Sequence, residues 1–385
     1  MRIGINASFL RKPGTGIGQV TWHFLRILAE LPASQDHEFF IYTENEVVKG
    51  PLPHDLVANF RYRARLPWWK RDDQIRKYLW ETKTLPSLVR KDTCDVLLSL
   101  YQSATVLNGI PHVVLVHDLI PEIFPEYRQT LRKQFFWNQV KKGLAGARAY
   151  IAVSRHTKED MVKYLHIDPS KVSVQKPSVD PLFEKEVCLP DKARVTMKYS
   201  LPEAFIYHGG GLEIRKNTEL VLRAYKALTR IMPEKELPCL VISGTIHSEK
   251  NPLATPVKKL IRELELEDRV SLLGHVPLAD LPVLYALATV FVYPSRYEGF
   301  GLPVLEAMKV GTPVITTRVA SIPEVGGEAV LYTRLDDSDA LACLMKKVVQ
   351  DAGLRAELSL GEKKIAQGFN WISFTNGILS AIQKI

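Results

Sequence analysis

The 385 residues, 46% hydrophobic and 24% charged, are too many for one hydrophobic core and predict two domains of a globular protein. The chain contains no apolar run near the 18 residues of a membrane-spanning helix, and residues 1–5 have the pattern of a strand rather than of a signal peptide. The net charge of +9 is concentrated in residues 1–180, which hold 26 Lys and Arg against 18 Asp and Glu, and this excess suits anionic lipid, nucleic acid or a charged substrate.

Short apolar strands alternate with helical segments along nearly the whole chain, which predicts an α/β fold with a parallel sheet in each half. Residues 176–199 mix prolines with charged side chains, and we interpret them as a linker between domains 1–179 and 180–368. Strands are expected at 2–9, 38–42, 95–100, 112–116, 149–153 and 171–175 in the first half, and at 204–208, 239–243, 270–273, 289–293 and 313–317 in the second.

Sheets of this kind bind ligands beyond the carboxyl ends of their strands, so the loops after the strands are the candidate site. The most informative loop runs from Tyr293 to Glu306 (YPSRYEGFGLPVLE) and continues as AMKVGTPVI. We expect a helix from Leu302, because Pro303 suits a first helical turn and Gly311 suits a C-terminal cap.

This loop offers groups for both an anion and a sugar. The N–H groups of residues 300–302 at the expected helix start would favour an anion such as a diphosphate. Glu298 in the loop and Glu306 about one turn into the helix supply carboxylates, which accept hydrogen bonds from vicinal hydroxyls. Together they could hold two sugars on either side of a diphosphate.

A second loop, Gly209–Asn217 (GGGLEIRKN), follows the strand 204–208 and precedes a predicted helix. Arg215 and Lys216 lie at the start of that helix, where cations oppose the helix dipole and favour a bound phosphate. Asn217 is expected to cap the helix. For Arg215, an exposed position remains an equal alternative.

A third loop, residues 14–18 (GTGIG), lies between the first strand and a helix expected from about Gln19. The pattern also suits a dinucleotide loop or an ordinary turn, although the nicotinamide fingerprint is poorly met. A fourth loop begins with His117 and Asp118, directly after the strand 112–116. His117 is expected to face the ligand site, and a buried structural histidine is the alternative.

The spacing of Glu298 and Glu306, with Gly-Phe-Gly between them and EAMKVGTPVI after, resembles the signature of a known family. The family is that of retaining GT-B glycosyltransferases of the large bacterial "group 1" type, the glycosyltransferase family 4-like mannosyl- and glucosyltransferases. The resemblance implies two doubly wound, Rossmann-like domains that face each other across a cleft. It also implies that the terminal helix 369–385 completes the N-terminal, acceptor-side domain, while 180–368 binds the nucleotide sugar.

The resemblance assigns donor-binding roles in the second domain. Glu298 would bind hexose hydroxyls, the main chain of Gly299, Phe300, Gly301 and Leu302 would meet the sugar and phosphate, and Glu306 would bind the ribose. The stretch after the strand 270–273 would meet the nucleobase at Val276 through its main chain, which leaves the base unreadable from the sequence.

The phosphate-binding loop departs from the family pattern. Lys216 is kept, but Gly210 stands where the family usually has an arginine. Phosphate binding would therefore depend on Lys216, with help from Arg215 or from main-chain N–H groups.

In the first domain, the resemblance places the glycine-rich loop over donor and acceptor. Gly16 would lie at the donor phosphate, and Gly14 and Thr15 on the acceptor side. His117 would touch the donor sugar near the reacting centre, and Asp118 would orient His117 or bind the acceptor. The catalytic set is then His117, Lys216 and Glu298.

The expected activity is retaining transfer of a hexose from UDP-glucose or GDP-mannose to a saccharide or lipid-linked saccharide in polysaccharide synthesis. No obvious nucleophile is present, so we expect front-face substitution in which the leaving phosphate takes the acceptor's proton. The only Asp-x-Asp, at Asp337 and Asp339, is interpreted as helix caps, and neither a metal nor another cofactor is expected. The four cysteines lack CxxC spacing, which indicates reduced thiols in the cytoplasm.

Two basic segments, residues 61–80 and 131–142, contain several Trp, Tyr and Phe side chains. Aromatic and cationic residues favour membrane interfaces, so peripheral contact with an anionic membrane is one hypothesis. Aromatic side chains in the core with solvated charges are the equally weighted alternative. No nucleic-acid-binding motif is present, and nucleic acid is not expected as a partner.

Other functions remain open on the sequence. Another GT-B activity, a phosphorylase or a nucleotide-sugar epimerase, is the main alternative among enzymes. A non-catalytic sugar-binding or nucleic-acid-binding protein is the alternative outside them.

Overall fold

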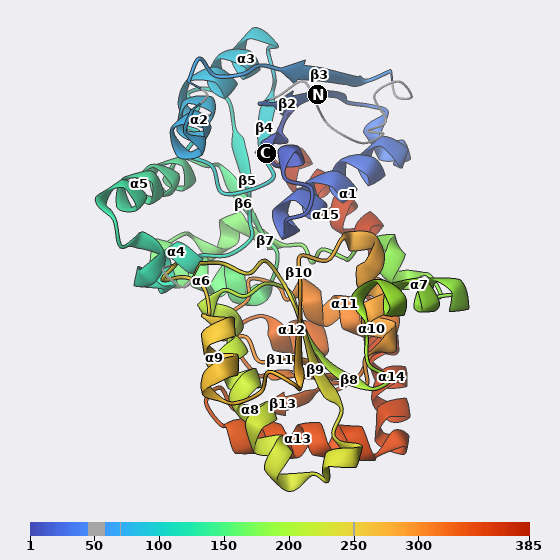
Figure 1. Ribbon diagram of the computed structural model, residues 1–385. Coiled ribbons are helices and arrows are strands. Elements are labelled where there is room, and N and C mark those ends of the chain that lie inside the picture. The colour runs from blue at the N-terminus through green and yellow to red at the C-terminus, as the bar shows by residue number, and fades with distance from the viewer. Residues whose placement is uncertain (45–57, 70, 249–250) are drawn as a thin grey trace. The chain divides into compact units, whose positions relative to one another are not determined.

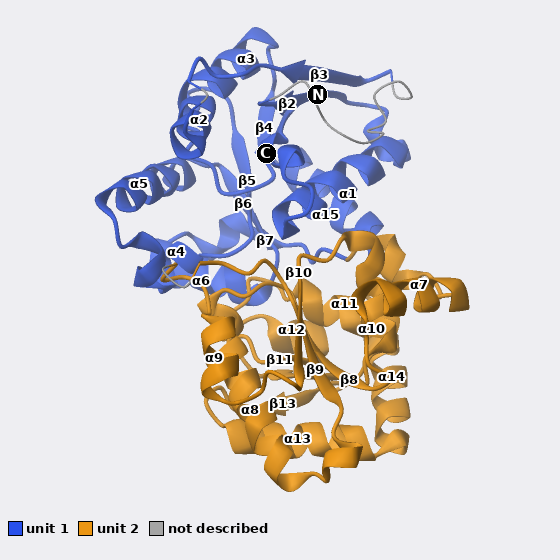
Figure 2. Ribbon diagram, viewed as in Figure 1, with its two compact units in different colours: residues 1–178, 369–385 blue, residues 179–368 orange. Residues whose placement is uncertain are grey.

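The computed structural model describes residues 1–44, 58–69, 71–248 and 251–385. The chain divides into two compact units, of which unit 1 comprises residues 1–178 and 369–385 and unit 2 comprises residues 179–368 (Figure 2). Each unit is a parallel β-sheet covered by helices, the α/β architecture expected from the sequence (Figure 1).

Unit 1 has a seven-stranded sheet with the order β3-β2-β1-β4-β5-β6-β7. The order reverses between the neighbours β1 and β4, and such a reversal is where α/β sheets bind ligands. The strands are β1 (Arg2–Asn6), β2 (Glu38–Thr43), β3 (Phe60–Ala64), β4 (Val96–Ser99), β5 (His112–Val116), β6 (Ala149–Ala152) and β7 (Val172–Val174), and the helices are α1 (Gly16–Glu30), α2 (Asp73–Leu79), α3 (Leu85–Lys91), α4 (Ile120–Ile123), α5 (Leu131–Ala145), α6 (Arg155–Leu165) and α15 (Trp371–Gln383).

Unit 2 has a six-stranded sheet with the order β10-β9-β8-β11-β12-β13, which reverses between β8 and β11. The strands are β8 (Phe205–His208), β9 (Cys239–Ser243), β10 (Val270–Gly274), β11 (Val290–Tyr293), β12 (Val314–Thr317) and β13 (Leu331–Thr333), and the helices are α7 (Leu189–Tyr199), α8 (Thr218–Ile231), α9 (Val257–Glu263), α10 (Leu281–Leu287), α11 (Leu302–Val310), α12 (Ile322–Gly326), α13 (Ser338–Gln350) and α14 (Ala352–Ala366).

The sequence missed one edge strand of each sheet, β3 and β13. Residues 60–64 (FRYRA) alternate apolar and charged side chains, as suits an edge strand, but their basic character pointed to a surface segment. β13 has only three residues. The interpretation of 176–199 as a linker was also wrong in its second half, because Leu189–Tyr199 forms α7 with Pro190 in its first turn.

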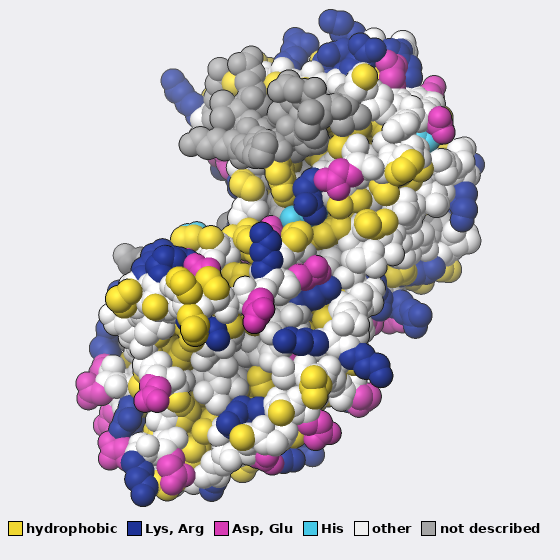
Figure 3. Space-filling model, turned by 90° about the vertical axis from the view of Figure 1, so that its right-hand side faces the viewer, with side chains coloured by type: hydrophobic (Ala, Val, Ile, Leu, Met, Phe, Trp, Pro, Cys, Tyr) yellow, Lys and Arg dark blue, Asp and Glu magenta, His cyan; other side chains and the backbone are white. Residues whose placement is uncertain are grey.

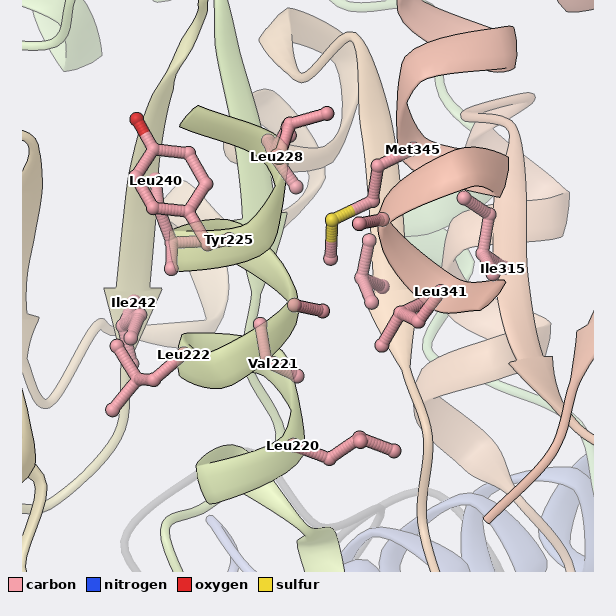
Figure 4. Close-up of a cluster of buried hydrophobic side chains, with 14 of the residues drawn as sticks. Leu220, Val221, Leu222, Tyr225, Leu228, Leu240, Ile242, Ile315, Leu341 and Met345 are labelled. Carbon is pink, nitrogen blue, oxygen red and sulfur yellow. The ribbon is translucent and has the colours of Figure 1, made fainter. Parts of the chain in front are cut away.

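The main core of unit 2 lies where α8 and α13 pack together against the sheet. Leu220, Val221, Tyr225 and Leu228 of α8 share this cluster with Met345 of α13 (Figure 4). α8 is strongly amphipathic in sequence, and its apolar face is the buried one. This packing fixes the start of α8, and with it the loop that follows β8.

The C-terminal helix α15 belongs to unit 1, where it packs against α1. The Trp371 and His23 rings are stacked with their centroids 4.8 Å apart. Among the described residues, no helix is long and apolar enough to cross a membrane. The charges of residues 181–385 are nearly balanced, 25 Lys and Arg against 24 Asp and Glu, and both signs are intermixed in the lower half of Figure 3.

We predict that Met345→Ala lowers the free energy of unfolding by about 2–5 kcal/mol, because it leaves a cavity between α8 and α13. Met345 is fully buried, whereas Met197 on α7 is 75% exposed and provides a matched control. Met197→Ala should change the free energy by less than about 0.5 kcal/mol in the same urea titration. Equal effects of the two substitutions would contradict this description of the core.

Candidate functional site

The central strands β8 and β11 of unit 2 pair in parallel, with Phe291 opposite Tyr207. Their carboxyl ends therefore lie side by side at the point where the strand order reverses. The loop 209–217 follows β8, and the loop 294–301 follows β11. Both loops that the sequence singled out in this half thus emerge at the same edge of one sheet.

One carboxylate oxygen joins the two loops. Glu298 Oε1 accepts hydrogen bonds from Lys216 Nζ at 2.8 Å and from a guanidinium nitrogen of Arg215 at 3.0 Å. It also accepts from the hydroxyls of Tyr293 at 2.8 Å and Ser295 at 2.7 Å. The second oxygen, Oε2, accepts no hydrogen bond from the described residues, so it is available to a ligand.

The charges of this cluster hold Glu298 ionised. Glu298 and Lys216 are buried, 7% and 5% exposed. Burial by itself would raise the pKa of Glu298, but Lys216 and then Arg215 outweigh it and lower the pKa to about 2. Burial lowers the pKa of Lys216, and its ion pair with Glu298 opposes that shift. Lys216 and Arg215 together provide two cations for one carboxylate, with Glu213 pairing Arg215 at the exposed rim.

The glycine loop packs directly on the start of α11. Gly210 has φ +87°, and a Cβ atom there would lie 2.9 Å from Pro303 Cγ and 3.1 Å from Tyr293 Cε2. An arginine could not occupy this position without moving α11, which accounts for the glycine where the family pattern has an arginine. Arg215 instead supplies the second cation, from five residues further along the loop.

The helix α11 begins at Leu302 and ends at Val310, and both predicted boundaries are confirmed. Gly301 precedes it with φ +108°, a conformation that favours glycine, and Gly311 follows with φ +89° and donates its N–H to the Ala307 carbonyl. The main chain of residues 299–301 is buried at the amino end of this helix, where anions are favoured.

Glu306 differs from Glu298 in having no cation bonded to it. Its Oε2 accepts a hydrogen bond from the Tyr285 hydroxyl at 3.0 Å, and its side chain is 8% exposed. Burial raises the pKa of Glu306 to about 7, although Tyr285 and Lys216 act in the opposite direction. The free protein therefore binds a proton at Glu306 over a range of pH where an ordinary glutamate is ionised.

Val276 and Asn217 are two further predicted positions in unit 2. Val276, which follows β10, is buried, with 5% exposure. Asn217 stands at the start of α8 with φ +60°, but its side chain does not cap the helix, contrary to expectation. It donates instead to the Leu335 carbonyl at 3.0 Å, because the left-handed backbone turns the side chain away from the first turn.

Part of the glycine-rich segment 14–18 of unit 1 is helical rather than a loop. α1 begins at Gly16, three residues before the predicted start, and the Thr15 hydroxyl caps it by accepting from the Gly18 N–H at 3.1 Å. Gly18 belongs to the first turn and lies so close to the Lys12 carbonyl that a Cβ would be 2.0 Å from it. Gly14 and Gly16 remain exposed.

His117 follows β5 at the carboxyl edge of the unit 1 sheet, as expected from the sequence. Its Nε2 lies 2.8 Å from the Leu100 carbonyl, so Nε2 carries the hydrogen and Nδ1 is left as an acceptor in the neutral ring. Burial lowers the pKa of His117 to about 4, so the ring is neutral at physiological pH. Asp118 accepts the Ile120 N–H at 3.0 Å and so orders the turn into α4.

The sequence did not single out Tyr293, Ser295 or Tyr285. Tyr293 ends β11 and Ser295 lies three residues before Glu298, so both were visible inside the strongest motif. Only the folded loop shows that their hydroxyls share an acceptor with Lys216. Tyr285 belongs to α10, and its contact with Glu306 has no signal in the sequence.

Within the described part of the chain, no three His, Cys, Asp or Glu side chains are grouped as a metal site requires. The expectation for the Asp-x-Asp is confirmed at Asp337, whose Oδ1 accepts the Ala340 N–H at 2.9 Å and caps α13.

Two family sequence models match the chain, one in each unit. The model described as "Glycosyltransferase Family 4" matches residues 16–182, and the one described as "Glycosyl transferases group 1" matches residues 197–364.

Curated relatives and solved structures agree with these matches. The chain is 31% identical to the O-antigen chain mannosyltransferase B of Escherichia coli over 281 residues, 71% of each chain. It is 25% identical to the O-antigen chain mannosyltransferase RfbU of Salmonella typhimurium over 357 residues, 90% of each. A sucrose-phosphate synthase of Thermosynechococcus elongatus superposes with a TM-score of 0.77 at 18% identity, covering 100% of this chain and 98% of that one, which shows the GT-B fold.

We predict that Gly210→Ala destabilises the protein more than Gly211→Ala does. Both glycines have positive φ, +87° and +105°, so each alanine carries a similar backbone cost of about 1 kcal/mol. Only at position 210 does the new Cβ collide with Pro303, which should add about 1–3 kcal/mol in urea denaturation. Equal losses would show that the glycine loop is not packed against α11 as described.

We predict that Glu306→Gln stabilises the ligand-free protein increasingly as the pH rises. Between its ordinary value of 4.5 and the folded value of about 7, Glu306 binds a proton in the folded state that the unfolded state has lost, so stability falls across this window. The glutamine variant lacks this loss and should gain up to about 3 kcal/mol over the native protein above pH 7. Denaturation curves from pH 5 to 8 measure the difference.

The control for that series is Glu357→Gln, which changes an exposed glutamate on α14. Its stability should follow the native protein at every pH. A pH-independent difference between Glu306→Gln and the native protein would contradict the raised pKa.

Proposed function

The chain belongs to the group 1 glycosyltransferases, and from this premise we propose that it transfers mannose from GDP-mannose to a saccharide, with retention of the anomeric configuration. The acceptor we propose is a lipid-linked saccharide of the O-antigen kind. The names of the two mannosyltransferase relatives support the sugar and the acceptor class.

The observation that carries the proposal is the state of Glu298. Two cations and two hydroxyls fix its Oε1, which leaves Oε2 as an oriented acceptor in a buried position. A carboxylate held in this way is suited to bind the hydroxyls of a hexose and to hold the sugar in one orientation. It is poorly suited to act as a nucleophile, because Lys216 and Arg215 stabilise its negative charge.

The diphosphate of the donor is proposed to bind between Lys216 and the amino end of α11. Lys216 and Arg215 provide positive charge, and the main chain of Gly299, Phe300, Gly301 and Leu302 adds N–H groups and the helix dipole. Glu306, one turn into the same helix, is proposed to bind the ribose hydroxyls, and Val276 to meet the base through its main chain.

The proposed reaction is a front-face substitution. The bond between the anomeric carbon and the phosphate oxygen breaks while the acceptor oxygen bonds to the same face of that carbon, and the acceptor proton passes to the departing phosphate. Lys216 and the α11 N–H groups stabilise the charge that develops on the phosphate, which is the largest contribution expected from the protein. A metal ion has no assigned part in this scheme.

Unit 1 is proposed to contribute the acceptor-side groups. His117 would touch the donor sugar as a neutral hydrogen-bonding ring, in keeping with its lowered pKa. Gly14, Thr15 and Gly16 at the start of α1 and Asp118 after β5 would contact the acceptor and the donor phosphate.

The test is a transfer assay with GDP-mannose and UDP-glucose, run in EDTA with a lipid-linked saccharide acceptor. We expect transfer from GDP-mannose alone, and NMR of the product should show the anomeric configuration of the donor. Transfer from UDP-glucose alone, an inverted product, or activity that returns only when Mg²⁺ or Mn²⁺ is added would each overturn the corresponding part of the proposal.

We predict that Lys216→Met and Glu298→Gln each lower kcat by about 10²–10³-fold, because one removes phosphate stabilisation and the other weakens the hold on the sugar. Lys259→Met, which removes an exposed lysine of α9 in the same unit, is the matched control and should keep full activity. Melting curves of all three proteins show whether the folded state survives. Folded variants with near-normal kcat would contradict the assignment.

A further inference from the structure

The positive charge of unit 1 is concentrated in two stretches without acidic residues. Between Asp55 and Asp72 the sequence has five Lys and Arg and no Asp or Glu. Between Glu126 and Glu159 it has eight Lys and Arg and again no acidic residue. The donor site in unit 2 uses none of these charges, so the proposed transfer reaction does not explain them.

The fold brings the two stretches together where α2 begins and α5 begins. The guanidinium of Arg132 on α5 pairs with the carboxylate of Asp72, which caps α2. The ring of Tyr78 on α2 contacts the rings of Phe135 and Phe136, with centroids 5.7 and 5.9 Å apart. Helices α2 and α5 lie on the same side of unit 1, at the left of Figure 2. Two segments about 60 residues apart in sequence therefore form one surface.

The structure divides the aromatic residues of these stretches between core and surface. Trp80 is fully buried and donates to Asn6 Oδ1 at 3.2 Å, and Trp137 is 7% exposed and donates to Glu122. In contrast, Trp68 is 79% exposed and Phe135 is 48% exposed. Packing in the core therefore explains the first pair and leaves the second pair unexplained.

Exposed aliphatic side chains accompany the exposed rings. Leu131, at the start of α5, is 84% exposed, and Leu66 is 42% exposed. Trp68 precedes Asp72 by only four residues, so it lies within about 14 Å of the α2–α5 junction. Single exposed apolar residues are ordinary, but four of them in two stretches that meet at the α2–α5 junction indicate a contact that removes them from water.

The cations among these side chains indicate the sign of the partner. Arg65 and Lys142 are exposed and have no ion-pair partner in the described part of the chain. With the four apolar residues they define the basic apolar patch: Arg65, Leu66, Trp68, Leu131, Phe135 and Lys142, of which the last three lie on one face of α5. Its partner should carry negative charge and also offer an apolar phase.

An anionic lipid surface meets both conditions better than a nucleic acid does. Nucleic acids gain binding energy from stacking on aromatic rings, but they offer nothing to an exposed leucine. A bilayer interface accepts Trp and Leu side chains among its headgroups and attracts each nearby Lys or Arg. The most exposed apolar side chain of the patch, Leu131, therefore favours lipid.

We propose that the basic apolar patch of unit 1 binds the surface of an anionic lipid bilayer. Trp68, Leu131 and Phe135 enter the headgroup region, while Arg65 and Lys142 contact the lipid phosphates. Contact of this kind would hold the enzyme at the surface where a lipid-linked acceptor is found, a consequence that rests on the proposed function, whereas the binding itself does not.

The test is flotation of the full chain with vesicles of phosphatidylcholine and phosphatidylglycerol at low salt, compared with vesicles of phosphatidylcholine alone. We expect binding to the anionic vesicles only, and release at high salt because exposed charges are screened. Arg65→Gln and Lys142→Gln should each reduce the vesicle partition coefficient roughly fivefold. Leu131→Ser combined with Phe135→Ser should abolish binding.

The matched control is Leu189→Ser combined with Met197→Ser, which removes two side chains of unit 2 that are 79% and 75% exposed. This variant should float like the native protein. The proposal is overturned if the native protein does not float with anionic vesicles, if the patch variants float unchanged, or if the control is the variant that loses binding. If the native protein binds an oligonucleotide but no vesicles, and the patch variants lose that oligonucleotide binding, the partner is a nucleic acid instead.

Flotation uses neither donor nor acceptor, so its result is separate from that of the transfer assay. The substituted residues are exposed, and unchanged melting curves should accompany every variant. A protein that transfers mannose but does not float would refute the membrane contact alone.

Discussion

The arrangement of unit 2 depends on one buried charge interaction, that between Glu298 and the cations Lys216 and Arg215. Glu298 lies in the loop after β11, and both cations lie in the loop after β8. The interaction therefore ties these two loops together. Removing one partner of a buried pair leaves an uncompensated charge and typically costs about 3–5 kcal/mol. The geometry of the candidate site is therefore fixed before any ligand arrives, which is the condition for electrostatic catalysis.

The parallel sheets explain why that interaction can form at all. A reversal of strand order between β8 and β11 sends their connections to opposite faces, which leaves room between the two loops at the carboxyl edge. Close packing then disfavours any side chain at position 210, because a Cβ there would lie 2.9 Å from Pro303 Cγ. The second cation must come from elsewhere in the loop, and Arg215 supplies it.

The alternation of strands and helices was predictable from the sequence, and eleven of the strands lie near their expected positions, because buried parallel strands are short apolar runs. The edge strands β3 and β13 were not predictable, because β3 is basic and β13 has only three residues. Glycine and proline chemistry located α11 at both ends, but it did not reveal that Thr15 caps α1 or that Asn217 leaves α8 uncapped. Side-chain partners such as Tyr285 depend on tertiary packing, which no local pattern contains.

The two glutamates of the motif illustrate that last limit and its consequence. They are eight positions apart in sequence, carry the same carboxylate group and are similarly buried. The structure gives Glu298 two bonded cations and Glu306 a single tyrosine hydroxyl, so the pKa of the first falls to about 2 and that of the second rises to about 7. Glu298 is thus a permanent anion that orients whatever it binds. In the proposed complex, the ribose hydroxyls would donate hydrogen bonds to Glu306 and favour its ionised form, so donor binding would be coupled to deprotonation of this buried carboxylate.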